Sequence, residues 1–322
     1  MTSRHLPIVL GLACSVGCSR GIDLQDDQRR VAGMLAQEYE SVFVASGGLL
    51  SPQGSYEGIP TQLTGELRMP FAGLLVSLQQ NEELRRSALL GLDGLQFAAV
   101  GAKDFRPPSG LGPVVASRCY ILRLSSTRSI DISRHGPGRP VSGDGHPAIW
   151  TWEVHAEGSD PEPFYVAQPS GNYVIIANDL KELERFVLRF AVSPREAFPG
   201  NEPGAGLPNF GATRSCPIWG YRAYRLEADI SSKQASGALD VGAHAQALLF
   251  IADLTNSKAS IRYVSSAELD DAPRRLQRSG RLPPFLPIGP RAWECTISLR
   301  SGRVSEEQLF TAISLFGFGL YL

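Results

Sequence analysis

The feature that most constrains this fold is a strict alternation of apolar and polar residues in several short segments. Trp150, Trp152 and Val154 alternate with polar residues, and the same period of two recurs at 224–230 and 293–299. Such a period places one face of a strand in the core and the other in water, as in antiparallel sheets. Strands of a doubly wound parallel fold would be apolar throughout. The alternation therefore predicts an α+β fold with a mainly antiparallel sheet and packed helices.

Two β-hairpins are each predicted to lead directly into a helix. The first pairs residues 164–168 with 173–177, and the second pairs 247–253 with 259–264, each across a polar turn. The recurrence of this hairpin–helix unit suggests two related halves of ferredoxin-like or similar type.

Capping residues indicate where the helices begin and end. Asp179, with Glu182 three residues later, predicts a capping box, and the sequence Ser-Glu-Glu-Gln at 305–308 predicts another. Another helix is expected over 267–279, ending at Gly280.

A first helix is expected from about Asp26. Val31, Leu35 and Val42 would share its apolar face, with Asp27 among the polar residues outside that face.

The Gly/Pro-rich stretch 198–217 is the expected boundary between the two halves. The predicted organisation is a signal peptide at 1–17, a tether and first helix at 18–60, an N-terminal half at 61–197, the linker at 198–217 and a C-terminal half at 218–322.

Composition limits the classes of function. The chain has 322 residues, 43% of them hydrophobic and 20% charged, which is enough for a sizeable core. A formal net charge of −1 lacks the basic excess of a nucleic-acid binder. Cys119, Cys216 and Cys295 are the cysteines beyond the leader and allow at most one internal disulfide, whose presence the sequence leaves open. Cys295, in an alternating strand, is predicted to be buried and inert.

The first eighteen residues have the layout of a secretory signal. Arg4 and His5 form a polar start, an apolar run covers Leu6–Ala13, and small residues follow. The run is about half of the ~20 residues that a membrane-spanning helix needs.

The segment Ser15-Val16-Gly17-Cys18-Ser19 resembles the processing site of a bacterial lipoprotein. The resemblance implies that Cys18 receives diacylglycerol and acyl chains such as palmitate, and becomes the new N-terminus. Ser19 implies retention in the outer membrane, facing the periplasm. The segment departs from the family pattern at Ser15, where leucine is preferred, and Cys14 is a poorer alternative. An ordinary cleaved signal, giving a secreted or periplasmic protein, and a cytosolic N-terminal helix are the other interpretations. The body resembles no recognised family.

Three groups of residues are candidates for catalytic or metal sites. The Gly-x-Ser-x-Gly pattern at 17–21 lies across the cleavage site, outside the strand–turn–helix context that a hydrolase nucleophile needs. The second group lacks the close, fixed spacing of zinc ligands and consists of His135, Asp144, His146, His155 and Glu157. The third group consists of Asp229, Asp240 and Asp253. Asp229 and Asp253 lie near predicted strand ends, where acids commonly mark turns, and any two of the 32 acids could be nominated as an acid–base pair in this way. We therefore predict no catalytic, cofactor-binding or metal-binding residues.

A basic cluster lies on and after the helix expected at 267–279. Its members are Arg274, Arg275, Arg278 and Arg281. A solvated helix face explains it most simply, and contact with an anionic partner, such as lipid headgroups or a cell-wall polymer, is the alternative.

These observations predict a non-catalytic cell-envelope lipoprotein that binds or scaffolds an envelope protein or polymer and contacts the membrane through its lipid. The alternatives are an envelope hydrolase whose site is assembled around the loop 135–155, and an assembly partner of an outer-membrane machine.

Overall fold

The structure is a computed structural model of the whole chain. The residues that it describes are 24–51, 59–75, 94–103, 117–125, 139–140, 149–154, 162–169, 172–192, 216–224, 244–268, 270–278, 281–300 and 302–317.

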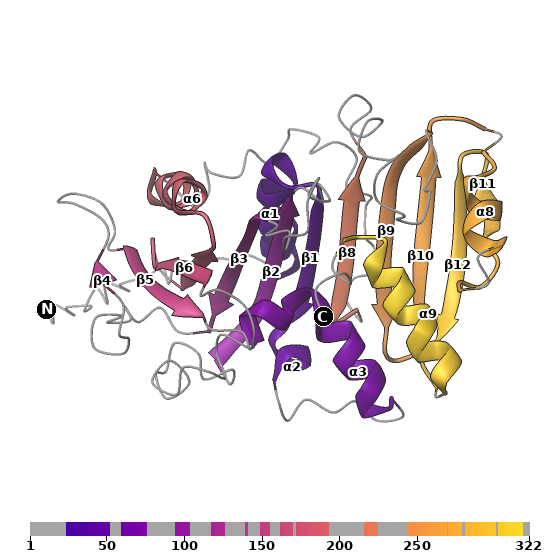
Figure 1. Ribbon diagram of the computed structural model, residues 1–322, viewed down its shortest axis with the longest axis horizontal. Coiled ribbons are helices and arrows are strands. Elements are labelled where there is room, and N and C mark those ends of the chain that lie inside the picture. Colours follow the sequence, from indigo (N-terminus) through magenta and orange to yellow (C-terminus); the bar gives the residue numbers. More distant parts are fainter. Residues whose placement is uncertain are drawn as a thin grey trace, which may run out of the picture.

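One large sheet runs the full width of the described fold (Figure 1). It has twelve strands in the order β11-β12-β10-β9-β8-β1-β2-β3-β7-β6-β5-β4. Neighbouring strands are antiparallel throughout. In chain order the strands are β1 (Ser41–Ser46), β2 (Leu95–Lys103), β3 (Ser117–Leu124), β4 (Arg139–Pro140), β5 (Ile149–Val154), β6 (Glu162–Ala167), β7 (Tyr173–Ala177), β8 (Ile218–Ala223), β9 (Ala245–Asp253), β10 (Lys258–Ser265), β11 (Leu286–Gly289) and β12 (Ala292–Ser298).

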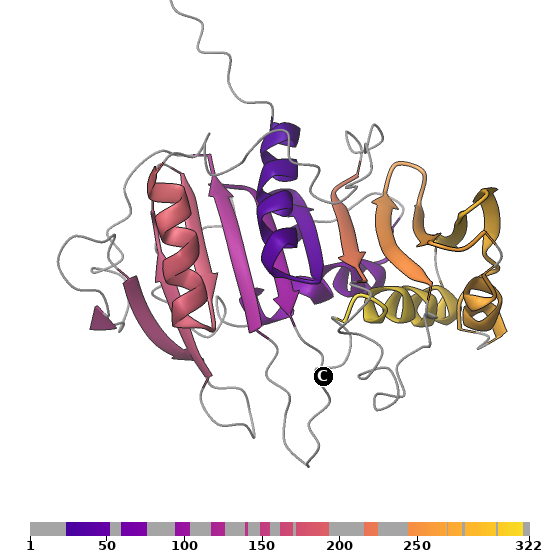
Figure 2. The ribbon, with the colours of Figure 1, turned by 90° about the horizontal axis from the view of Figure 1, so that it is seen from above.

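Helices cover both faces of this sheet, and the two faces hold separate hydrophobic clusters. The helices are α1 (Leu24–Glu38), α2 (Gly47–Leu50), α3 (Thr61–Arg68), the 3-10 helix η1 (Met69–Phe71), α6 (Leu180–Val192), α8 (Ala272–Arg278) and α9 (Arg303–Ser314). The helices α1 and α6 lie on one face of the sheet (Figure 2). Their apolar side chains belong to one hydrophobic cluster, and those of α2, α3, α8 and α9 belong to the other. No helix in the described ranges has the length and apolar character needed to cross a bilayer.

The predicted α+β class is confirmed, and so are both hairpins. The strands β6 and β7 pair with each other, and β9 pairs with β10, each pair leading into a helix. Alternating burial is clear in β10, which lies toward one side of the sheet, whereas β7 is buried throughout. Successive residues of β7 contribute to the two hydrophobic clusters in turn, so this strand has no wet side and its sequence does not alternate.

Some predicted boundaries are wrong. Val42 lies in β1, because the first helix ends at Glu38 and the chain enters the sheet at Ser41. The helix α9 begins at Arg303 with Gly302 as its N-cap (φ 119°), a conformation that favours glycine. Ser305 therefore lies inside the first turn, where it does not cap the helix. The expected helix over 267–279 is shortened to α8, and the predicted strand 224–230 falls outside the described residues except for Tyr224.

The strand β1, from the segment predicted as tether and first helix, lies inside the sheet, where it pairs with β2 of the predicted N-terminal half and with β8 of the predicted C-terminal half. Outward from the β1–β8 seam the strand orders correspond: β1-β2-β3-β7-β6 on one side and β8-β9-β10-β12-β11 on the other. The helices α6 and α9, which follow corresponding strands, pack on opposite faces. In this order β6, β7 and α6 correspond to β11, β12 and α9, and not to the unit of β9, β10 and α8 that was predicted as their counterpart. A relation between the halves stays a prediction, as do the domain boundaries.

Candidate functional site

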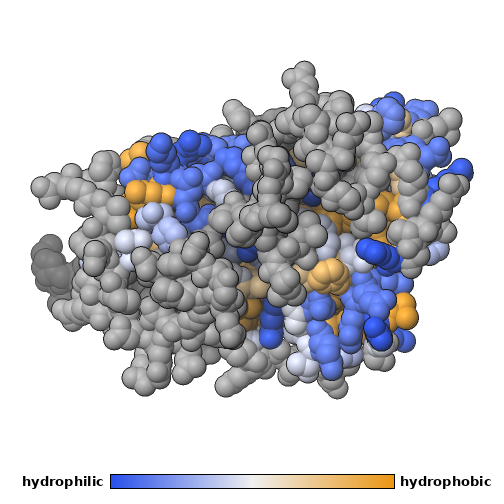
Figure 3. Space-filling view, viewed as in Figure 1, coloured by the Kyte–Doolittle hydropathy of each residue, from blue (hydrophilic) through white to orange (hydrophobic). Residues whose placement is uncertain are grey.

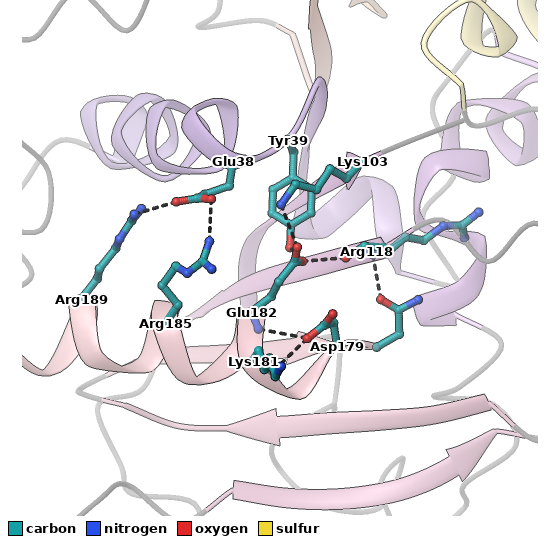
Figure 4. A network of polar contacts seen from close by, with 11 residues as sticks. Glu38, Tyr39, Lys103, Arg118, Asp179, Lys181, Glu182, Arg185 and Arg189 are labelled. Carbon is teal, nitrogen blue, oxygen red and sulfur yellow. Dashed lines mark hydrogen bonds and ion pairs between the residues drawn. The ribbon is translucent and has the colours of Figure 1, made fainter. Parts of the chain in front are cut away.

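The most elaborate polar site in the described part of the chain surrounds the carboxylate of Glu182, in the first turn of α6 (Figure 4). The Tyr39 hydroxyl donates a short hydrogen bond to Glu182 Oε2, and Ser117 Oγ donates to the same oxygen at 2.6 Å. Lys103 Nζ donates to Oε1 at 2.9 Å and forms an ion pair with it. Both carboxylate oxygens therefore have donors from within the protein.

Four separate elements bring these groups together. Tyr39 follows the last residue of α1, Lys103 ends β2, Ser117 begins β3, and Glu182 lies in α6. The Tyr39 ring lies directly against Gly101, where an added Cβ would come within 2.5 Å of a ring carbon. Glycine at this position thus permits the close approach of α1 to the sheet.

The cap of α6 orients Glu182 toward the sheet. Asp179 Oδ1 accepts hydrogen bonds from the backbone amides of Lys181 (2.8 Å) and Glu182 (3.2 Å), which confirms Asp179 as the predicted cap. The prediction that Glu182 would complete a capping box is wrong, because its carboxylate turns instead to the donors on β2, β3 and the end of α1.

The protonation states of the site follow from burial and hydrogen bonding. Burial of the Glu182 carboxyl raises its pKa, but hydrogen bonds from Lys103, Ser117 and Tyr39 and the Lys103 charge outweigh it, so the pKa is lowered overall. Burial raises the pKa of Tyr39 far above its usual value, and the nearby Cys119 and Glu182 add to this. The carboxylate is thus ionised and the phenol keeps its proton. The hydrogen bonds that the Glu182 carboxylate accepts are therefore charge-assisted, and they hold the start of α6 to the sheet.

A free thiol lies beside this site. Cys119 on β3 is fully buried and unbonded to another cysteine, and burial and the neighbouring Glu182 carboxylate raise its pKa well above the usual range. A thiol in this environment stays protonated and is a poor nucleophile. Cys216 and Cys295 also form no disulfide. Cys295 is buried, and burial raises its pKa to about 12, as expected for the inert core residue that the sequence predicted.

Ion pairs join α1 to α6 next to the Glu182 site (Figure 4). Glu38 accepts hydrogen bonds from Arg185 (2.9 Å) and Arg189 (2.7 Å), and these pairs are partly exposed. Exposed ion pairs contribute little free energy, about 0–1 kcal/mol each, so the Glu182 cluster dominates this contact.

A second buried carboxylate holds the start of α1. Asp27, only 1% exposed, forms an ion pair with Arg123 on β3 and accepts a hydrogen bond of 2.5 Å from the Tyr173 hydroxyl on β7. Arg123 Nε donates in turn to Gln96 Oε1 at 2.8 Å. The prediction that Asp27 lies on a polar outer face is therefore wrong, because paired groups on the sheet compensate its burial.

A third cluster lies at the start of α8. Asp270 accepts hydrogen bonds from the Tyr263 hydroxyl (2.5 Å), Ser265 Oγ (2.7 Å) and the Ala272 amide (2.8 Å). Burial of the Asp270 carboxyl raises its pKa, but these donors, with Tyr263 first among them, outweigh that effect and lower the pKa overall. Asp270 thus caps α8 and joins it to β10.

The lowered pKa of Asp270 predicts a loss of stability in acid. A carboxyl whose pKa is lower in the folded than in the unfolded state stabilises the fold fully above the unfolded-state pKa, about pH 4, and this contribution is lost as the pH falls through the folded-state value. We expect an Asp270→Asn variant to show a shallower decline in urea midpoint between pH 6 and pH 3 than the wild type. Asp271→Asn, at a highly exposed neighbour, is the control and should keep the wild-type slope. Parallel curves for wild type and Asp270→Asn would contradict this assignment.

The residues singled out from the sequence are distributed very differently. Most of them lie outside the described residues: Cys18, the 17–21 pattern, His135, Asp144, His146, His155, Glu157, Asp229 and Asp240. Asp253 accepts hydrogen bonds from the amide and side chain of Asn256 and so stabilises the turn between β9 and β10. Within the described residues, no group of three His, Cys, Asp or Glu side chains could hold a metal ion.

Two of the four arginines in the basic cluster have described side chains. Arg274 projects from α8 with its side chain 78% exposed, 4.0 Å from Asp271, and Arg281 is exposed after the helix. Arg275 and Arg278 belong to α8, but their side chains lie outside the description. Contact of this cluster with an anionic partner remains a prediction.

The described surface on the α3–α9 side is mostly hydrophilic, with separate hydrophobic spots (Figure 3). The large exposed apolar residues among those described are Leu24, Leu188, Leu286, Ile288, Val304 and Phe310. Scattered single apolar residues are normal for a protein surface and do not define a binding site.

Comparisons with known proteins assign no family. No family model matches the chain, and no curated protein matches its sequence. Crystal forms III and IV of TP0453 each overlap with it at a TM-score of 0.43, with 10% and 8% identity, covering 85% of this chain and 95% and 94% of theirs. Crystal form I gives 0.42 and 10% identity, over 88% of this chain and 96% of that one. An overlap this loose carries neither a fold family nor a function to this chain.

Proposed function

We propose that this chain is a lipid-anchored protein of the bacterial cell envelope whose folded body binds or scaffolds a partner without catalysis. The observation that carries the proposal is the leader, in which a short polar start and an apolar run end at Ser15-Val16-Gly17-Cys18-Ser19. On this proposal Cys18 is acylated, and Ser19 favours the outer membrane, facing the periplasm. A secreted or periplasmic protein with an ordinary cleaved signal is the alternative address.

The chemistry of the described polar sites supports a binding role. The carboxylates of Glu182, Asp27 and Asp270 are each engaged by donors from the same fold, and each joins a helix to the sheet. Groups used in this way stiffen a surface that a partner can recognise. The alternative is a hydrolase with its site around 135–155. Within that range the structure describes residues 139–140 and 149–154.

Substituting Cys18 tests the anchor. We expect the wild-type chain to fractionate with membranes and to yield an acylated N-terminal peptide beginning at Cys18, and the Cys18→Ser variant to lose both properties. Acyl chains contribute about 0.8 kcal/mol per buried CH₂, so several chains hold a protein firmly to a bilayer. The measurements are membrane fractionation and mass spectrometry of the N-terminal peptide.

Cys14→Ser is the matched control, because Cys14 also lies in the leader, four residues earlier. It should leave fractionation and the mass of the processed chain unchanged. A Cys18→Ser chain with the mass and distribution of the wild type would rule out the anchor. Where Cys18→Ser does release the chain, cross-linking of intact envelopes shows whether the anchored wild type keeps a partner that the released variant loses.

A further inference from the structure

The first turn of α1 is fixed tightly to one end of the sheet. Asp27 is 1% exposed, and its two partners, Arg123 and Tyr173, lie at the end of β3 and the start of β7. Arg123 also donates to Gln96 near the start of β2. Because these partners are themselves part of the sheet, α1 cannot pivot about its first turn without breaking a buried ion pair.

The strand ends around Asp27 form one ordered edge, which we call the α1-start rim: Gln96, Leu124, Ser125, Asn172 and Tyr173. Backbone hydrogen bonds join Leu124 to Asn172 (2.8 Å) and Ser125 to Gly94 (2.7 Å). The Asn172 side chain also donates to the Leu124 carbonyl at 2.7 Å. The rim is therefore held as one unit, and its polar side chains Gln96, Ser125 and Asn172 are uncharged.

The Glu182 site marks the opposite end of the same strands. Lys103 ends β2 and Ser117 begins β3, so both lie across the sheet from the α1-start rim. The strand β3 has eight residues, which at about 3.3 Å per residue separates the two ends by about 25 Å.

The chain between the proposed anchor and α1 is short. From Cys18 to Leu24 there are six Cα–Cα steps (24 − 18), which span at most about 20 Å even when fully extended. Since Asp27 fixes the helix within its first turn, the tether gains no length by unwinding α1. A lipid on Cys18 therefore holds the start of α1 within about 20 Å of the bilayer surface.

We propose that the α1-start rim faces the membrane and that its partner there is the lipid headgroup surface. The inference rests on the proposed lipid anchor at Cys18. Leu24, 37% exposed beside the rim, and the uncharged polar side chains of the rim suit the interfacial region, where hydrogen-bond donors meet headgroup oxygens. The Glu182 end and the first turn of α6 then point away from the bilayer, toward the aqueous space where a partner would dock.

Energy transfer to labelled lipid tests this orientation. The lipidated protein is purified from membranes with Cys216 replaced by serine, because Cys216 is half-buried whereas Cys119 and Cys295 are buried. A donor dye is placed at Ser125→Cys on the rim or at Lys181→Cys on α6, both exposed positions, and each protein is reconstituted into phosphatidylcholine–phosphatidylglycerol vesicles carrying a headgroup acceptor. We expect transfer from position 125 to exceed that from position 181 by about two-fold or more, since the two ends lie about 25 Å apart.

An Asp27→Asn variant with the same labels checks the role of the clamp. Removing the charge frees the first turn of α1 and lengthens the tether, so the difference in transfer between the two positions should shrink. Thermal unfolding of each labelled protein verifies that the fold is intact.

The outcomes separate this inference from the proposal on which it rests. Equal transfer from both positions, or more from position 181, with the lipid present on Cys18 by mass spectrometry, overturns the orientation and leaves the anchor standing. A mass without lipid on Cys18 overturns the anchor and the orientation with it. Greater transfer from position 125 that shrinks in Asp27→Asn supports both.

Discussion

Replacing Glu182 with glutamine should lower the free energy of unfolding by about 2–3 kcal/mol, because it removes the charge that Lys103, Ser117 and Tyr39 surround. Removing one partner of a fully buried ion pair costs about 3–5 kcal/mol. The Glu182 side chain is 12% exposed and that of Lys103 is 34% exposed, so water compensates part of the loss. We therefore expect about 2–3 kcal/mol and not the cost of a fully buried pair. Urea denaturation at pH 7 measures the change.

Glu184→Gln is the matched control for this substitution. Glu184 lies on the same helix, two residues further on, with its side chain exposed, and the change should stay within about 0.5 kcal/mol. A double-mutant cycle with Tyr39→Phe should give a coupling energy of about 0.5–3 kcal/mol, since the two side chains are in direct contact. Equal effects of Glu182→Gln and Glu184→Gln would mean that the cluster does not hold α6.

Sequence pattern located the cap of this helix but not the site that the helix builds. Asp179 could be predicted because a cap and its amides are neighbours in the chain. The partners of Glu182 lie 65 to 143 residues away along the sequence, and only the tertiary arrangement brings them together. For the same reason, Asp27 looked like a solvated residue although its partners lie on β3 and β7.

Likewise, the local sequence pattern predicts some strands of the sheet and not others. Strands with one wet face, such as β12, alternate in sequence and are therefore predicted as strands of an antiparallel sheet. The strand β1 is buried over almost its whole length between helices on both faces, so Val42 looked like the continuation of a helix. The order of the strands, above all the β1–β8 seam, depends on long-range pairing that no local pattern encodes.

The ring of Phe43 lies at the pairing of β1 with β8. Phe43 on β1 is fully buried and lies against Gly220 on β8, where an added Cβ would come within 2.6 Å of the ring. The same ring packs edge-on against Phe316, after α9, at 5.2 Å between centroids, and tilted against Phe250 on β9 at 5.8 Å. One aromatic ring on β1, which precedes the predicted N-terminal half, therefore fills a space formed largely by the predicted C-terminal half.

Phe43→Ala should accordingly destabilise the protein by about 3–5 kcal/mol, the cost of an aromatic cavity in a core that cannot collapse around it. If the seam makes the two halves one cooperative unit, denaturation monitored by circular dichroism and by tryptophan fluorescence should give one coincident transition that moves as a whole to lower urea. Phe310→Ala, at a ring 37% exposed on α9, is the control and should shift the midpoint far less. Two separate transitions, with only one displaced by Phe43→Ala, would instead show that the predicted halves fold independently and that the shared sheet is a docking contact between them.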